Sequence, residues 1–432
     1  MGWCAGQPVS AERFCAAARE LAATLPPKSY VLNLCGDRLN FMLAFAAALI
    51  ARQVSLLPYS KAPGVVRDLS HSHPDSYCIS DASDLPSGLP AIMVPPWSVG
   101  AGTSNVPEIP GDQTALIAFT SGSTGHPQAH VKNWESLVLD GRTLGAALGI
   151  RSETPCSIIG TVPPQHVYGL ETTVMLPLQT GMAIHSACPL LPADIASMLA
   201  ELPGERWLAT TPIHLRGCVG EESRFPPLAG IVCATMPLSP ELACQAESTL
   251  AAPIHEIYGC TEAGAVALRR PVLTERWRVR QGMRLWRKGE ETWVEGNHLP
   301  QPLRLPDTLE LLSATEFVLL GRPDDMVKVA GKRVSIDALN RELLRVAGVH
   351  DGVFFIPAGV EGSETRLGAL VVAPNCEPGV ILRALRERID PAFLPRPLLI
   401  VDALPRNATG KLTREGLLAL AESVQARSER TA

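Results

Sequence analysis

A strand-like segment followed at once by hydroxyl and glycine residues is the first feature that could do chemistry. Residues 115–119, ALIAF, have the length and apolar character of a buried strand, and TSGSTG follows directly. Glycines let backbone N–H groups converge on one point and short hydroxyls add donors, which suits phosphate oxygens. The GxxxxGK(S/T) spacing of a Walker A loop is absent. A phosphate-binding loop and a Ser/Gly-rich surface turn are both open for Thr120, Ser121, Gly122, Ser123, Thr124 and Gly125.

Three downstream segments carry further polar side chains. They are IYGCTEAG at residues 257–264, GRPDDMVKVAGKRV at 321–334 and LPRNATGK at 404–411. In this order, and after FTSGSTGHPQ at residues 119–128, they resemble the signature motifs of the adenylate-forming superfamily. That superfamily includes acyl- and aryl-CoA synthetases, nonribosomal-peptide adenylation domains and luciferases. The resemblance runs from about residue 29 to residue 414.

The resemblance implies ATP-dependent activation of a small-molecule carboxylic acid. A thiol attacks a carboxylate poorly because the carboxylate oxygens are poor leaving groups, whereas a mixed anhydride with AMP has a good one. The enzyme therefore holds ATP and Mg²⁺ and aligns the acid with the α-phosphate. The acyl group then passes to the pantetheine thiol of CoA or of an acyl carrier protein.

The same resemblance assigns roles to individual residues around the nucleotide. The loop at residues 120–125 would hold the β- and γ-phosphates, and Tyr258, otherwise a core tyrosine, would stack on adenine. Thr261 would touch the α-phosphate, and Glu262 would bind Mg²⁺, because a carboxylate together with phosphate oxygens suits a hard cation. Asp307, which precedes Gly321 by 14 positions, would bind the ribose hydroxyls.

The remaining implied roles lie near the C-terminus and around the acid. Arg322 would reach the ribose, Asp324 would be the hinge of a mobile C-terminal lid, and Lys411 would bridge the substrate carboxylate and the α-phosphate. The predicted domains are thus residues 1–322 and residues 323–432. The predicted acid-pocket residues are His166, Tyr168, Thr211, Thr235, Gly259 and Ala265. No metal-ligand spacing connects His126, His130, His214 and His255, which are interpreted as structural.

One departure concerns the residue after the proline of the phosphate loop. The superfamily usually has lysine there, and this chain has Gln128. Lys132, one helical turn further on, is a candidate to reach the phosphates instead, although a solvated lysine is the alternative. The PQxHxK pattern and the trimmed N-terminal region resemble compact aryl-acid ligases of aryl polyene and xanthomonadin-type pigment pathways. This finer resemblance implies a 4-hydroxybenzoate-like acid.

The elements that must position these residues follow from hydrophobic patterning. Strand-like and helix-like segments alternate through the first 250 residues, which predicts a doubly wound α/β body with mixed sheets. Helix 40–50 would begin with Asn40 as its N-cap, residues 86–112 would be mostly loop, and residues 276–295 would form a small antiparallel sheet. A small α+β lid is predicted at the C-terminus.

Composition limits the class of protein. The 432 residues are 46% hydrophobic and 19% charged, which favours two or three folded domains. The net charge of −5 with no long basic run argues against nucleic acid as a partner. Eleven scattered cysteines without a CxxC pair indicate free thiols in a reducing cytoplasm. The apolar residues 41–50 are too few to span a bilayer.

Two alternatives remain open at this stage. A nucleotide-binding sensor or scaffold that has lost catalysis would explain Gln128, although Glu262, Asp307 and Lys411 are all present. A stand-alone amino-acid adenylation domain would usually place an aspartate early in its pocket, and residues 161–168 contain no acidic residue.

Overall fold

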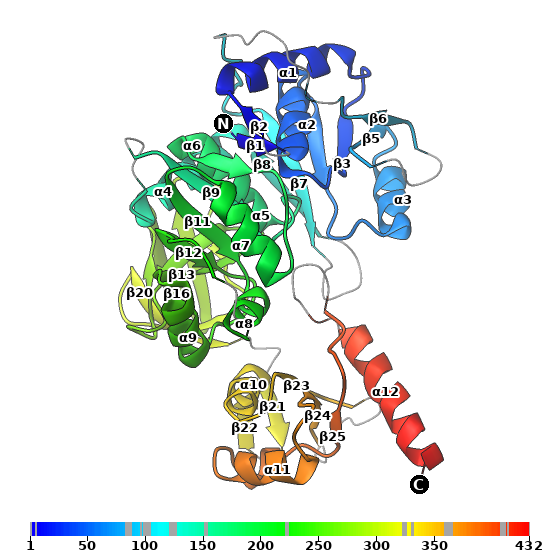
Figure 1. Cartoon of the computed structure of the whole chain (residues 1–432), viewed down its shortest axis with the longest axis vertical. Coiled ribbons are helices and arrows are strands. Elements are labelled where there is room, and N and C mark those ends of the chain that lie inside the picture. The colour runs from blue at the N-terminus through cyan, green and yellow to red at the C-terminus, as the bar shows by residue number, and fades with distance from the viewer. Residues whose placement is uncertain are drawn as a thin grey trace. The chain divides into compact units, whose positions relative to one another are not determined.

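The chain folds into two compact units. The first takes residues 1–286, 293–303 and 312–316, and the second takes residues 287–292, 304–311 and 317–432 (Figure 1). This computed structural model describes residues 2–4, 7–82, 89–95, 97, 105–120, 128–150, 154–220, 224–321, 326–329, 332–357, 366–406, 412 and 414–431. The domain boundary predicted at residues 322 and 323 and the hinge predicted at Asp324 lie outside the described residues.

A six-stranded sheet in the first unit carries the strand that leads into the phosphate-loop motif. Its strand order is β6–β5–β3–β4–β7–β8, and all neighbours are parallel except β7 and β8. The strands are β3 (Tyr30–Asn33), β4 (Val54–Leu57), β5 (Ser76–Ser80), β6 (Ala91–Met93), β7 (Thr114–Thr120) and β8 (Gln128–Asn133). Helices α1 (Ala11–Thr24), α2 (Arg38–Ile50), α3 (Pro63–Ser72) and α4 (Trp134–Ala147) lie between or beside them in sequence.

A second, longer sheet in this unit runs in the order β15–β14–β13–β12–β11–β9–β10–β1–β2. Its strands are β1 (Gly2–Cys4), β2 (Gln7–Val9), β9 (Cys156–Gly160), β10 (Ala183–His185), β11 (Glu205–Thr210), β12 (Gly230–Cys233), β13 (Ile254–Cys260), β14 (Gly264–Arg269) and β15 (Arg276–Val279). Strands β9 to β13 pair in parallel, and β13, β14 and β15 pair antiparallel. The predicted doubly wound α/β body with mixed sheets is confirmed.

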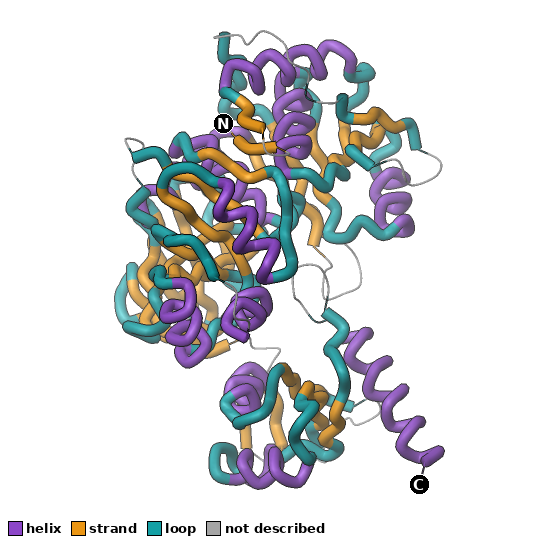
Figure 2. The backbone as a smooth tube through the Cα atoms, in the orientation of Figure 1, coloured by secondary structure: helices purple, strands orange, loops and turns teal. Residues whose placement is uncertain are grey.

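The helices of the second sheet follow its parallel strands along the chain. Figure 2 draws helices in purple and strands in orange. They are α5 (Val167–Leu170), α6 (Leu176–Thr180), α7 (Pro192–Glu201), α8 (Pro212–Gly220) and α9 (Pro240–Leu250). A single π-helical turn, η1 (Glu171–Met175), joins α5 to α6. Such turns insert one extra residue per turn and re-aim the side chains on them, and they occur often at functional sites.

The prediction that residues 86–112 are mostly loop is confirmed for the described residues there, which contain the short strand β6. Three other local predictions are wrong. Helix α2 starts at Arg38, and its N-cap is Asp37, which accepts a hydrogen bond from the Asn40 backbone N–H. The segment predicted as one small sheet is divided, because β15 joins the long sheet whereas β16 (Met283–Lys288) and β17 (Glu291–Gly296) pair with β18 (Leu303–Arg304). Lys132 lies on strand β8 rather than on a helical turn.

The second unit contains both helices and strands. A three-stranded sheet, β23 (Asp351–Phe355), β24 (Gly368–Val372) and β25 (Leu398–Ile400), packs through Phe354, Ala369 and Val371 with apolar residues of two helices. Its other elements are β19 (Thr308–Leu311), β20 (Glu316–Gly321), β21 (Met326–Val329), β22 (Lys332–Ser335), α10 (Ile336–Leu344), α11 (Pro378–Arg386), η3 (Pro391–Phe393) and α12 (Arg414–Thr431). Across the described part of the chain, every helix is too short or too polar to cross a membrane.

Candidate active site

The turn between strands β13 and β14 presents Thr261 and Glu262. Gly264 has a φ of +71°, and a Cβ there would lie 2.6 Å from Glu171 Oε1, so glycine is needed. A Cβ at Gly259 would lie 2.3 Å from the Gly264 carbonyl oxygen. The strand register also shifts at Tyr258 and Gly259, which is how a bulge redirects the end of a hairpin.

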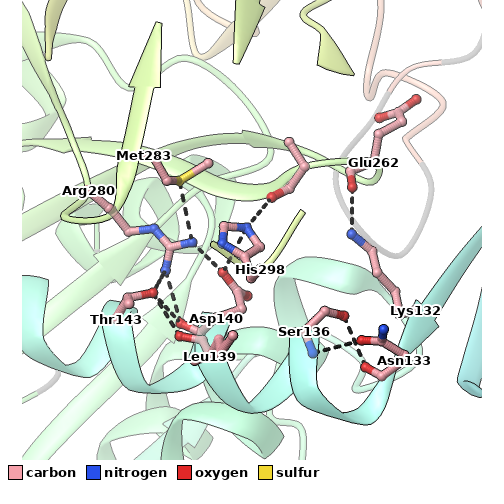
Figure 3. Close-up of polar contacts among 11 residues, drawn as sticks. Lys132, Asn133, Ser136, Leu139, Asp140, Thr143, Glu262, Arg280, Met283 and His298 are labelled. Atoms are coloured by element: carbon pink, nitrogen blue, oxygen red, sulfur yellow. Dashed lines mark hydrogen bonds and ion pairs between the residues drawn. The ribbon is translucent and has the colours of Figure 1, made fainter. Parts of the chain in front are cut away.

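Strand β8 brings three polar side chains to one face, because residues two apart on a strand point the same way. These are Gln128, His130 and Lys132, which pair across the ladder with Thr120, Ala118 and Leu116. His130 Nε2 lies 3.2 Å from Thr120 Oγ1 and 3.7 Å from Glu262 Oε1. Lys132 Nζ donates a 2.6 Å hydrogen bond to the Glu262 carbonyl (Figure 3). Three predicted nucleotide-site residues, Thr120, Lys132 and Glu262, are therefore close together.

The charge state of His130 follows from its surroundings. Burial lowers the pKa of the ring and outweighs the nearby Glu262 carboxylate, which raises it. The ring is therefore neutral at pH 7 and can donate or accept one hydrogen bond at Nε2. It connects the end of the phosphate-loop strand to the turn that carries Glu262.

Glu262 has the chemistry of a magnesium ligand. Its side chain is 39% exposed, and its carbonyl oxygen is held by Lys132, so the carboxylate is the group that faces outward. Among the described residues, no cluster of three or more His, Cys, Asp or Glu side chains could form a protein cage for a metal. Mg²⁺ needs no such cage, because one or two carboxylates with substrate phosphates and waters suffice. The residues present fit this ion.

Hydroxyl and imidazole groups gather where strands β9 and β11 end. Thr161 Oγ1 lies 3.0 Å from Thr210 Oγ1 and 3.1 Å from His214 Nδ1, and Thr211 Oγ1 lies 2.9 Å from the same His214 nitrogen. Burial lowers the pKa of His214, so its ring is neutral at pH 7. Ligands of doubly wound sheets bind at the carboxyl ends of strands, which makes this cluster a candidate acid pocket.

Thr235, just beyond strand β12, has an unusual backbone. Its φ is +80°, which is rare for a β-branched residue. Its buried hydroxyl has no hydrogen-bond partner among the described residues. Strain and an unpaired polar group together typically mark functional positions.

Two other predicted pocket residues on this part of the sheet are buried. The Tyr168 hydroxyl lies 2.9 Å from the Thr210 carbonyl oxygen and 2.8 Å from that of Val232, so it ties β11 to β12. Ala265 is 1% exposed. His166 precedes α5 as its N-cap residue, and Gly259 is exposed at the hairpin bulge. The roles of these four residues at the acid remain predictions.

Tyr258 packs as a core aromatic residue. It is 7% exposed, and its ring meets Trp277 edge-on with centroids 5.8 Å apart. Contact with adenine remains a prediction for this residue. Asp307 is half-buried directly before β19 in the second unit. The predicted residues Ser121, Gly122, Ser123, Thr124, Gly125, Arg322, Asp324 and Lys411 lie outside the described residues.

Sequence patterns missed several residues of the site. His130 and His214, which lack metal-ligand spacing and are predicted to be structural, both lie among predicted site residues. The period-two spacing of Gln128, His130 and Lys132 is the signal that identifies a strand face. No local sequence pattern identifies Asp140, Arg280 or His298. Their contacts are buried and join segments that are more than 100 residues apart in the sequence.

Comparison with known proteins shows which family the chain resembles. The sequence profile of the AMP-binding enzymes matches residues 22–288. The chain is 30% identical to a 4-coumarate–CoA ligase of Halorhodospira halophila over 315 residues, which are 69% of this chain and 75% of that protein.

Solved structures confirm the fold. ATP-bound MatB from Rhodopseudomonas palustris superposes with a TM-score of 0.80 at 16% identity, over 96% of this chain and 93% of that chain. The o-succinylbenzoate CoA synthetase from Bacillus subtilis, solved with its acyl-adenylate intermediate, superposes with a TM-score of 0.79 at 18% identity, over 94% of this chain and 92% of that chain. The predicted arrangement of a large N-terminal α/β part and a smaller C-terminal part is confirmed.

Proposed function

This chain belongs to the AMP-binding enzyme family and is an ATP-dependent acid–thiol ligase, and we propose that its substrate is an aromatic carboxylic acid such as 4-hydroxybenzoate. The relative named a 4-coumarate–CoA ligase supports an aromatic substrate. The finer resemblance of the PQxHxK pattern to ligases of aryl polyene and xanthomonadin-type pigment pathways supports the same choice.

The observation that supports adenylate formation at this site is the proximity of two segments that are distant in sequence. Thr120, at the end of the phosphate-loop strand, and Glu262, at the hairpin tip, both lie near His130. A nucleotide whose β- and γ-phosphates occupy the loop would then have its α-phosphate near Thr261. Mg²⁺ bound at Glu262 would neutralise phosphate charge.

The reaction has two balanced steps. The acid carboxylate oxygen bonds to the α-phosphorus of ATP, and the bond to the β-phosphate oxygen breaks, which releases pyrophosphate. The pantetheine thiol of CoA or of a carrier protein then loses its proton to solvent, its sulfur bonds to the acyl carbon, and the acyl–oxygen bond breaks, which releases AMP. In the first step Thr261 would hold the α-phosphate, and Lys411 would bring the two anions together. Arg322 and Asp307 would hold the ribose.

The test is acid-dependent pyrophosphate release with ATP and Mg²⁺. The panel contains 4-hydroxybenzoate, 4-coumarate, a fatty acid and several amino acids, each with and without CoA or a phosphopantetheinylated carrier protein. Release that depends on an aromatic acid supports the proposal, and the thiol that gives a thioester identifies the acceptor. Release with amino acids alone would favour the amino-acid adenylation alternative. ATP binding without release for any acid would favour the sensor alternative.

Glu262→Gln provides a matched check on the site. Loss of the carboxylate should lower pyrophosphate release by on the order of 100-fold, because the variant keeps the shape of the side chain but not its charge. Glu290→Gln is the control, since this exposed carboxylate lies on the turn between β16 and β17. It should leave the rate unchanged.

A further inference from the structure

The carbonyl groups of the hairpin turn are held from within the first unit. Lys132 Nζ on strand β8 donates to the Glu262 carbonyl at 2.6 Å. His298 Nε2 lies 2.9 Å from the carbonyl oxygen of the next residue, Ala263. Two side chains from segments far apart in sequence therefore fix successive peptide groups of the turn (Figure 3).

A buried polar cluster contacts His298 and shares a small cavity with Lys132. Asp140 on helix α4 pairs with Arg280 and lies 3.7 Å from His298 Nε2. Arg280 also donates to the Asp140 carbonyl and to Thr143 Oγ1, at 3.0 and 3.2 Å, so its position is fixed by several contacts (Figure 3). A small cavity at this place is lined by Lys132, Asp140, Glu171, Gly264 and His298 among others.

Arg280 is paired within the cluster, whereas the charge of Lys132 is directed at the turn. Arg280 neutralises Asp140, since the two side chains are 0% and 5% exposed and in direct contact. Burial, and then the neighbouring Asp140 carboxylate, raise the pKa of Glu171 well above its usual value and disfavour a second negative charge there. Lys132 lies beside this acid and a compensated ion pair, and donates to the Glu262 carbonyl.

We propose that Lys132 is a positioning residue, which fixes the turn of Thr261 and Glu262 through the Glu262 carbonyl rather than by contacting the β- and γ-phosphates. This inference rests on the proposed function, because it assigns the α-phosphate to Thr261 and Mg²⁺ to Glu262. It also explains the Q-x-H-x-K spacing, which places His130 at the Glu262 carboxylate and Lys132 at its carbonyl.

The two roles of Lys132 predict different nucleotide affinities. A lysine that fixes the turn affects every ligand with an α-phosphate, so Lys132→Met should weaken AMP and ATP binding by similar factors of about tenfold. A lysine on the β- and γ-phosphates would affect ATP alone. Calorimetric titration of purified protein with AMP, with ATP, and with ATP plus Mg²⁺ measures the affinity for each nucleotide.

Equal weakening supports the inference, and so does a smaller gain in ATP affinity on addition of Mg²⁺, because the turn that carries Glu262 is no longer fixed. Weakened ATP binding with unchanged AMP binding would overturn it, as would no change in either. Lys132→Arg keeps the charge and the donor and should recover part of the loss. Lys28→Met is the control, because it removes a partly exposed lysine that pairs with Asp75 at 3.4 Å.

A second measurement tests the inference if the Lys132→Met variant folds poorly. Amide hydrogen exchange is measured in Lys132→Arg and Lys132→Gln, for residues 258–266 and, as a reference, for strand β12. Lys132→Gln, which lacks the charge, should exchange faster than wild type in residues 258–266 but not in β12. Unchanged exchange in the turn would count against the inference. Wild-type protein that binds neither nucleotide would overturn the proposed function as well, whereas normal wild-type binding with an unaffected variant overturns this inference alone.

Discussion

Asp140 on helix α4 and Arg280 directly after strand β15 form an ion pair inside the first unit. Removal of one charge leaves the other buried without compensation. We expect Asp140→Asn to lower the free energy of unfolding by about 3–5 kcal/mol. Urea denaturation at pH 7 measures this loss.

The exposed pair of Arg304 and Glu291 is the comparison for that prediction. These side chains are 60% and 44% exposed, so Glu291→Gln should cost about 1 kcal/mol or less. Equal losses in the two variants would mean that burial does not determine the contribution of the Asp140 pair.

Glu171 should tolerate replacement by glutamine, because burial and the neighbouring Asp140 carboxylate raise its pKa in the folded protein. Since the folded pKa is raised, above pH 4.5 the folded state binds more protons than the unfolded state and stability falls as pH rises. Glu171→Gln removes this dependence and should change stability at pH 5 by about 1 kcal/mol or less. Its stability relative to wild type should then increase from pH 5 to pH 8 in urea titrations. A constant difference across that range would contradict a raised pKa for Glu171.

Buried histidines should make the protein less stable in mild acid. Burial, and then the charge of Arg270, lower the pKa of His255, whose ring packs on Trp207 with centroids 5.9 Å apart. Below the unfolded value of 6.5 the unfolded chain binds the proton and the folded chain does not, so stability is lost as pH falls through that value. His255→Gln should lose less stability than wild type between pH 7.5 and pH 5.5. Equal losses in urea titrations would exclude a contribution from this ring.

Substitutions at Thr235 can distinguish the effect of backbone strain on stability from the effect of the hydroxyl on function. Its positive φ costs about 1–3 kcal/mol, which glycine relieves at an entropic cost of about 0.5–1 kcal/mol. We therefore expect Thr235→Gly to raise the free energy of unfolding by about 1 kcal/mol and to raise the KM for the acid. Thr235→Ala loses the hydroxyl but keeps a Cβ, so it should not gain this stability. An unchanged KM in both variants would remove Thr235 from the pocket.

Local patterns predicted the repeating architecture but not the exact boundaries or the long-range contacts. The alternation of apolar strands and helices identifies the α/β body, because burial on both faces demands it. The start of helix α2 was misplaced, since Asp37 and Asn40 are both good N-caps and only the fold selects Asp37. Strand β15 pairs with β14 rather than with β16, and an alternating pattern along one strand does not show which neighbour that strand pairs with.

The residues of the candidate site likewise include some that local patterns predicted and others that they did not. Thr120 and Glu262 were found because their neighbours form ordered motifs. The assignment of Lys132 to a helical turn was wrong, because its period-two polar spacing was not used to identify a strand. The partners Asp140, Arg280 and His298 carry no motif, since a buried ion pair is specified by packing around it and not by spacing in sequence.

Substitution of Lys411 should affect the two half-reactions of the ligase differently. The first step brings a carboxylate to an anionic α-phosphate, so it needs a cation between them, whereas attack of a thiol on the acyl adenylate does not. We expect Lys411→Ala to slow acyl-adenylate formation by on the order of 100-fold or more and to slow thioester formation from supplied acyl adenylate far less. Pyrophosphate release measures the first step, and thioester formation from synthetic adenylate measures the second. Equal losses in both steps would assign Lys411 a structural role, with Lys28→Met as the control for removal of a lysine charge.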